Sequence, residues 1–158
     1  MSTQPQPLVD HDELVAGLAR AGRAAQRVLA RMDSAGKAAA LRSAAAALRS
    51  HADAILDANA RDLAAGQANG LSAAMLDRLK LTPDRVAAMA DGVAAVAKLK
   101  DPVGDVIDTV KRPNGLSLSR VRVPIGVIGI IYESRPNVTA DAAALCIGSG
   151  NAVILRGG

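Results

Sequence analysis

The residues best suited to bind an anion lie in one short stretch, Tyr132–Asn137, which has the sequence Tyr-Glu-Ser-Arg-Pro-Asn. The apolar run Val127–Ile131 before it is typical of a buried strand, and the residues after it are predicted to form a helix. Open α/β sheets bind ligands where a strand's carboxyl end meets such a helix. Arg135 can contact a phosphate or carboxylate with two donors, and the helix N-terminus adds backbone donors. The stretch predicts an anion site, and the alternative is an ion pair between Arg135 and Glu133 that only shapes the loop.

The chain contains one cysteine, Cys146, and this is the only thiol that could act as a nucleophile. It lies in Ala142–Ile147, on the apolar side of a predicted helix, with no histidine or lysine near it in the sequence. Such surroundings are typical of a buried structural cysteine. A single cysteine also excludes an internal disulfide and a multi-cysteine zinc site. We therefore expect Cys146 to be structural, and we expect no metal site.

Composition excludes several other classes of function. Phe and Trp are absent and Tyr132 is the only aromatic residue, which excludes nucleic-acid platforms built on stacked rings. The net charge of +4 is not gathered into a basic block, so we expect no nucleic-acid partner. The longest charge-free apolar run, Val123–Tyr132, is about half of what a bilayer span needs. We expect no membrane association and a cytoplasmic protein.

The glycines do not form a standard dinucleotide-binding fingerprint. Gly126 and Gly129 have GxxG spacing, and Gly148 and Gly150 follow a helix where the fingerprint would follow a strand. Spacing alone therefore favours turn and packing roles for these residues.

Residues 1–102 are predicted to be helical, since 29 of the 34 alanines precede residue 100. An irregular leader is expected at residues 1–9, and the helix after it should turn Leu14, Leu18 and Val28 inward. A second helical region, from Ser34 to about Gly66, has a possible break near Ser50–His51. A short helix should follow Ser72, and Thr82-Pro83-Asp84 should begin another. The expected inward residues of that last helix are Val86, Met89, Val93 and Val96.

The pattern changes after residue 102. Residues 103–124 alternate around the turn signal Pro113-Asn114-Gly115 and predict an antiparallel hairpin. Residues 125–158 predict a βαβ unit, whose second strand ends at Leu155. Two parallel strands buried on both faces need further strands and covering helices. We therefore expect either a fragment of a longer protein or a partner that supplies the rest.

Two segments, Arg122–Thr139 and Ser149–Gly158, closely resemble the gamma-glutamyl phosphate reductase family of the aldehyde dehydrogenase superfamily. The resemblance covers essentially the whole chain, and the Tyr-Glu-Ser-Arg-Pro-Asn string is specific to this family. It implies an α/β, aldehyde-dehydrogenase-like fold. Residues 1–102 would then be the helical N-terminal region of the cofactor domain, residues 103–124 an oligomerisation-type hairpin, and residues 125–158 the first βαβ unit of the NADP-binding sheet.

The resemblance implies NADPH-dependent reduction of L-glutamate 5-phosphate to L-glutamate 5-semialdehyde and phosphate, in proline biosynthesis. A cysteine thiolate displaces the phosphate, and hydride from the nicotinamide reduces the resulting thioester. Arg135, with Asn137 beside it, falls at the oxyanion-binding position, and Arg156 falls where a cation suits the cofactor's 2′-phosphate. Other residues fall at the cofactor cleft: Ile130, Ile131 and Tyr132. Full-length members are expected to form homo-oligomers.

The family's nucleophilic cysteine lies downstream of anything that matches Cys146. No catalytic residue is therefore expected within these 158 residues. An alternative to the enzymatic interpretation is a non-catalytic, split-enzyme subunit that associates with a partner carrying the catalytic domain.

We expect the 158-residue polypeptide alone to show no cofactor- and phosphate-dependent turnover of glutamate semialdehyde, because it lacks that thiolate. The absorbance of reduced nicotinamide measures this directly. Measurable turnover that Cys146→Ala abolishes would contradict the structural role of Cys146.

Overall fold

The computed structural model describes residues 11–133 and 135–157, so the expected leader at residues 1–9 lies outside the described part. Five helices come first, then a β-hairpin and a βαβ unit, as the sequence predicted. The elements are α1 (His11–Leu29), α2 (Ser34–Ser50), α3 (Ala52–Ala68), α4 (Ala73–Leu79), α5 (Pro83–Val96), β1 (Val106–Lys111), β2 (Ser117–Val121), β3 (Val127–Ile131), α6 (Pro136–Gly148) and β4 (Ala152–Arg156).

The helix boundaries follow from capping residues. Asp33 caps α2 by accepting a hydrogen bond from the Gly36 amide at 2.7 Å. Ser72 and Thr82 cap α4 and α5 in the same way, and Pro83 occupies the first turn of α5. The predicted break in the second helical region is confirmed, since α2 and α3 are separate helices that meet at His51.

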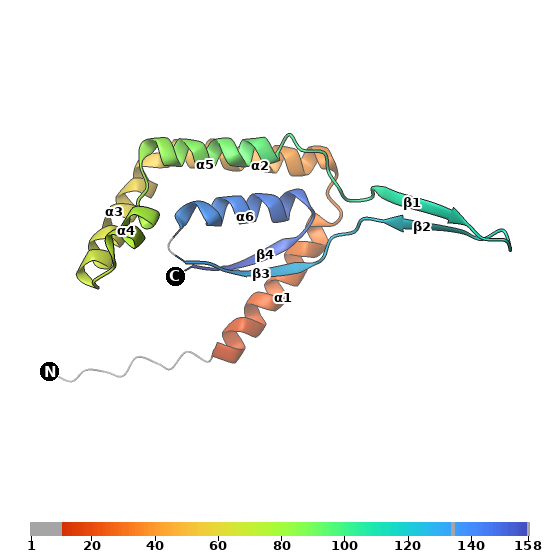
Figure 1. Ribbon diagram of the computed structural model, residues 1–158, viewed down its shortest axis with the longest axis horizontal. Helices are drawn as coiled ribbons and strands as arrows, with labels where there is room; N and C mark the ends of the chain where they lie inside the picture. Colours follow the sequence, from red (N-terminus) through yellow and green to blue (C-terminus); the bar gives the residue numbers. More distant parts are fainter. Residues whose placement is uncertain (1–10, 134, 158) are drawn as a thin grey trace.

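The centre of the fold is a parallel pair of strands with a helix against each face, and these helices cover the strands only in part. β3 pairs with β4 in a register that runs from Val127 opposite Ala152 to Ile131 opposite Arg156. α6 connects the two strands and covers one face, α1 lies against the other face, and α2 and α5 form an outer layer over α6 (Figure 1). The carboxyl ends of both strands therefore open at the same edge.

The parallel register is fixed at its start by a buried asparagine. The Asn151 side-chain oxygen accepts a hydrogen bond from the Gly126 amide at 2.7 Å, and the Ala152 amide donates to the Gly126 carbonyl at 3.0 Å. Gly126 has a φ of +130°, a conformation that residues with a Cβ rarely adopt. This pair of contacts aligns the two strands before their ladder begins.

The core lies between α2, α5 and α6 and is built mainly from small side chains. Its buried residues are Leu41, Ala45, Val93, Ala97 and Ala144. Alanines at these contacts let the helix backbones approach closely. The predicted inward face of α5 is confirmed, because Val86, Met89 and Val93 are buried and Val96 is partly buried.

Two expectations about burial are wrong. The predicted inward face of α1 is exposed, with 64% of Val28 accessible, because α1 turns its Gly22 side toward the sheet. A Cβ at Gly22 would lie 3.0 Å from Cγ1 of Val127. The strands are also not buried on both faces, since Ile131 is 80% exposed and no residue of β3 is fully buried. Within the described residues, β3 and β4 pair only with each other, so the outer edge of each strand has no pairing partner.

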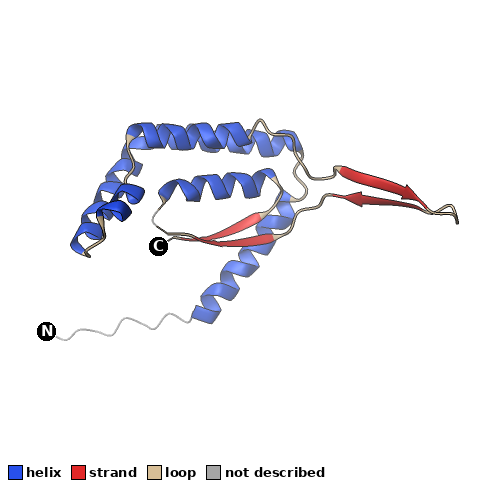
Figure 2. Ribbon diagram, viewed as in Figure 1, coloured by secondary structure: helices blue, strands red, loops and turns tan. Residues whose placement is uncertain are grey.

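The predicted hairpin is confirmed and projects away from the helices (Figure 2). β1 and β2 are antiparallel, and Gly115 takes a positive φ of +85° in the turn between them. The two strands carry exposed apolar side chains: Val106, Ile107, Val110, Leu118 and Val121. Such a surface is typical of a protein–protein contact. Within the described residues, no helix is both long enough and apolar enough to cross a bilayer.

A buried ion pair ties the start of α2 to the segment that enters the hairpin. Lys37 Nζ lies 2.5 Å from Asp101 Oδ2, and the side chains are only 5% and 16% exposed. Burial alone would raise the pKa of Asp101. The hydrogen bond from Lys37, another from the Val103 amide and the charge of Lys37 outweigh this effect, so the pKa is lowered.

We expect Lys37→Met to lower the free energy of unfolding by about 3 kcal/mol, because it leaves the Asp101 carboxylate poorly solvated and unpaired. The matched control is Lys100→Met, which removes the exposed pair with Asp105 and should cost less than about 1 kcal/mol. Urea unfolding measures both changes. Equal losses for the two variants would contradict the assignment.

The same pair gives a pH dependence with a defined sign. The pKa of Asp101 is lower in the folded state, so the contribution of the pair is present above the unfolded-state pKa of about 4. It is lost as the pH falls through the folded-state pKa. The difference between Lys37→Met and the unsubstituted chain should therefore shrink at acidic pH.

Candidate functional site

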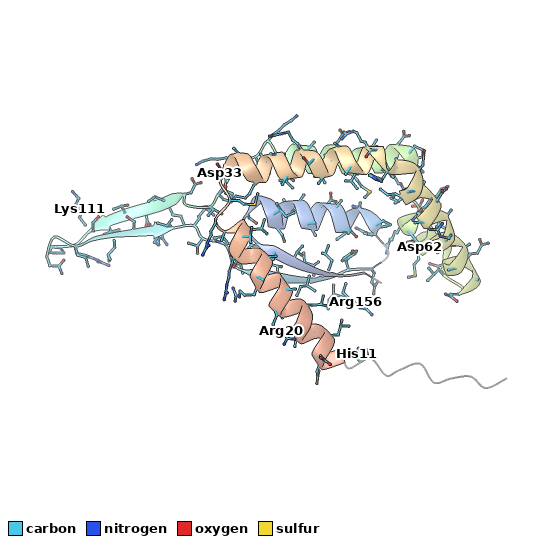
Figure 3. All side chains as sticks on the ribbon, turned by 180° about the vertical axis from the view of Figure 1, so that it is seen from behind. His11, Arg20, Asp33, Asp62, Lys111 and Arg156 are labelled. Carbon is cyan, nitrogen blue, oxygen red and sulfur yellow. The ribbon has the colours of Figure 1, made fainter. Side chains whose placement is uncertain are left out.

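The residues expected to contact a cofactor meet at the carboxyl edge of the parallel strands. Ile131 and Arg156 are register partners at the ends of β3 and β4, and the Tyr132 amide donates to the Arg156 carbonyl at 3.1 Å. Ile130, one position earlier, is partly buried, whereas Ile131 and Arg156 are exposed. Figure 3 shows Arg156 at the end of the sheet remote from the hairpin. The fold thus brings together four residues from two separate segments.

The Tyr132 ring is held in place at this edge. Its hydroxyl forms a hydrogen bond with the Thr139 hydroxyl on α6. A Cβ at Gly157 would lie 3.7 Å from the Tyr132 hydroxyl oxygen and 3.8–3.9 Å from two carbons of the ring, so the chain leaving β4 passes close beside it. The ring therefore links the end of β3 to both the following helix and the end of β4.

Arg135 lies at the N-terminal end of α6 with its side chain exposed. It makes no side-chain cap, and no ion pair within the described residues joins it to Glu133. The first turn of α6 contains Pro136, which has no amide hydrogen, and Asn137, whose side chain donates to Asp141 at 3.2 Å. The ion pair that was the alternative to an anion site is thus not found in the described structure.

Arg135 and Asn137 line a cavity of about 420 Å³ that the sequence did not reveal. The opposite wall comes from α4, from α5 and from the segment between them, where Asp77, Arg78, Lys80 and Arg85 lie. About 50 residues separate the two walls in the sequence, so no local spacing could have signalled the cavity. A volume in this range is typical of small-molecule sites.

The wall formed by α4 and α5 is held by a buried side chain on α3. Asn59 donates to the Leu79 carbonyl at 2.8 Å and accepts from the Leu81 amide at 2.7 Å. Both atoms of the amide are thus used to fix the backbone around Lys80. The position of Arg78 and Lys80 therefore depends on α3 as well as on their own segment.

Cys146 lies far from this edge. It is ten residues beyond the start of α6 at Pro136, or about 15 Å along the helix axis. It is only 6% exposed, and burial raises the pKa of its thiol. A raised pKa disfavours the thiolate form that a nucleophile requires. Within residues 11–133 and 135–157, no group of histidine, cysteine or acidic side chains could hold a metal ion.

Comparison with known proteins gives one consistent relationship. No protein-family model matches the chain. Gamma-glutamyl phosphate reductase from Novosphingobium aromaticivorans is 69% identical over the whole chain, and that from Sphingopyxis alaskensis is 65% identical over 92% of it. The chain spans 37% and 34% of the length of these two relatives, so it matches only part of each.

Two crystal structures show the same fold. Gamma-glutamyl phosphate reductase from Thermotoga maritima matches 91% of the chain with a TM-score of 0.86 and 42% identity. The enzyme of that name from Saccharomyces cerevisiae matches 90% of the chain with a TM-score of 0.85 and 40% identity. The chain covers 35% and 36% of these structures. The expected mixed α/β fold is confirmed.

Proposed function

The chain belongs to the gamma-glutamyl phosphate reductase family, and on that premise we propose that it forms part of an NADPH-dependent reductase of L-glutamate 5-phosphate. The products are L-glutamate 5-semialdehyde and phosphate, and the reaction serves proline biosynthesis in the cytoplasm. The observation that carries the proposal is the meeting of Tyr132 and Arg156 at one edge of the sheet, with Arg135 at the start of the helix that follows β3, within a sequence 69% identical to a relative of that name.

Two features at the carboxyl edge of the strands support the binding of a phosphorylated dinucleotide. Arg156 offers an exposed guanidinium at the end of β4, which suits the 2′-phosphate of NADPH. Ile130, Ile131 and Tyr132 offer backbone and apolar surface beside it for the rest of the cofactor. NADPH, when bound, supplies the hydride. The protein's part is to orient the cofactor and to keep water from this surface.

Arg135 holds the acyl phosphate in this proposal. Its side chain is exposed into the cavity and has no ion-pair partner within the described residues, so its donors are available to phosphate oxygens or to an oxyanion. Such donors stabilise charge that develops during the reaction. The nucleophilic thiolate would come from residues outside this chain, because Cys146 is buried at the other end of α6 with a raised pKa.

The exposed apolar surfaces support the proposal that this chain packs against additional polypeptide in the active enzyme. Ile131 lies open beside the sheet, and the hairpin presents a row of apolar side chains. Both a continuing chain and a separate catalytic subunit would cover Ile131. The hairpin is suited to an oligomer contact between copies of the enzyme.

We expect Arg135→Ala to lower kcat about 100-fold, since it removes donors from the developing negative charge. The enzyme to use is a chimera in which these 158 residues replace the matching segment of the N. aromaticivorans relative. Arg112→Ala, at the exposed hairpin turn, is the matched control. Unchanged turnover in Arg135→Ala would refute the role of Arg135, and an inactive but folded chimera would refute the proposed function.

We expect Arg156→Ala, in the same chimera, to raise KM for NADPH about tenfold or more through loss of a charge-assisted contact. The KM for NADH should change little, because NADH lacks the 2′-phosphate. Initial rates with each cofactor give both values. Equal effects on the two cofactors would show that Arg156 does not contact that phosphate.

A further inference from the structure

We infer that the cavity beside Arg135 binds the amino-acid end of the substrate, with Arg78 and Lys80 holding the α-carboxylate and Asp141 holding the α-ammonium group. The inference rests on the proposed function and adds to it the residues that select the substrate. The acyl phosphate at Arg135 is common to many activated acids. The other end of the molecule identifies it as an amino acid.

The charges that line the cavity match those of the substrate. Four cations and two carboxylates line it: Arg78, Lys80, Arg85, Arg135, Asp77 and Asp141. The side chains that line the cavity thus have a formal net charge of +2. Glutamate 5-phosphate carries a balanced carboxylate and ammonium together with a phosphate of nearly two negative charges. A ligand whose other end carried only a carboxylate, or only an ammonium group, would leave either the carboxylates or some of the cations of the cavity without a partner.

Two of the six charged groups serve the frame of the cavity. Arg85 donates to the backbone carbonyls of Asp77 and Lys80 at 2.7 Å and 2.6 Å, and it pairs with the Asp77 carboxylate at 3.4 Å. These contacts close the segment between α4 and α5 onto the start of α5. Together with the Asn59 clamp, they fix the backbone that carries Arg78 and Lys80.

Arg78 and Lys80 are then the cations that remain for a ligand on this wall. No ion pair within the described residues engages either side chain. A guanidinium binds a carboxylate with two parallel hydrogen bonds, and an ammonium group adds a point charge beside it. The pair therefore has the chemistry of a carboxylate site.

Asp141 is the carboxylate that remains on the opposite wall. It lies on α6, partly buried, six residues beyond Arg135, or about 9 Å along the helix axis. One of its oxygens accepts from Asn137 at 3.2 Å, which orients the group. Its other oxygen lies 3.5 Å from where a Cβ of Gly92 would stand, so α5 contacts that side. An ammonium group in the cavity can approach the oriented carboxylate while Arg135 holds the far end of the same ligand.

The test compares three aldehydes in the oxidative direction, in which aldehyde, phosphate and NADP⁺ give acyl phosphate, NADPH and a proton. L-glutamate 5-semialdehyde carries both the α-carboxylate and the α-ammonium group. 5-Oxopentanoate lacks the ammonium group, and 4-aminobutanal lacks the carboxylate. The enzyme is the chimera described above, and the readout is the ratio of kcat/KM values between aldehydes.

We expect Asp141→Asn to lower the preference for glutamate semialdehyde over 5-oxopentanoate about 100-fold, because an amide can still accept from Asn137 but cannot pair with an ammonium group. The preference over 4-aminobutanal should persist in this variant. The double variant Arg78→Gln, Lys80→Gln should show the reverse pattern. It should lose the preference over 4-aminobutanal and keep the preference over 5-oxopentanoate.

The control is the double variant Arg61→Gln, Lys98→Gln, which removes two exposed cations outside the cavity. Both preferences should be unchanged in it. If the unsubstituted chimera turns over glutamate semialdehyde but both cavity variants keep its preferences, the inference is wrong and the proposed function stands. If the folded chimera has no activity while the N. aromaticivorans enzyme is active, the proposed function and the inference both fail.

Discussion

The parallel pairing of β3 with β4 is the constraint on which the candidate site depends. Its register places Ile131 opposite Arg156, and Asn151 fixes that register through the Gly126 amide. A shift by one residue would move each side chain to the other face of the sheet. The end of β3, the start of α6 and the end of β4 would then no longer meet. A buried polar side chain 25 residues from its partner thus determines where the candidate site forms.

The alanine-rich helices serve this pairing by building a thin, close-packed cover. The core between α2, α5 and α6 is formed largely by alanine and valine side chains, so the helices lie close together over the strands. Close packing also brings the segment between α4 and α5 up to the start of α6, where the charged cavity forms. The same small side chains that stabilise the layers therefore position the two walls of the cavity.

The chain has one part whose apolar side chains form a buried core and another part whose apolar side chains are exposed. The core residues of α2, α5 and α6 are buried, although an apolar pocket lined by Leu41, Val93 and Ala144 opens between these helices. The Lys37–Asp101 pair joins this core to the base of the hairpin. The apolar side chains of the hairpin, α1 and Ile131 are exposed. Their exposure is expected of a chain that spans little more than a third of the length of its relatives.

The sequence by itself determined the elements and predicted an anion site at Tyr132–Asn137, which stays a prediction. Capping residues predicted where α4 and α5 begin, alternation predicted the hairpin, and the apolar run before Tyr132 predicted β3, because these signals act between near neighbours. It could not determine which face of α1 packs against the sheet. That face contains Gly22, which packs because it has no side chain to clash with Val127, and hydrophobicity patterns do not detect this. The cavity also required the tertiary structure, because its charges come from segments about 50 residues apart. Local patterns specify local conformation, whereas only packing decides which distant side chains face the same space.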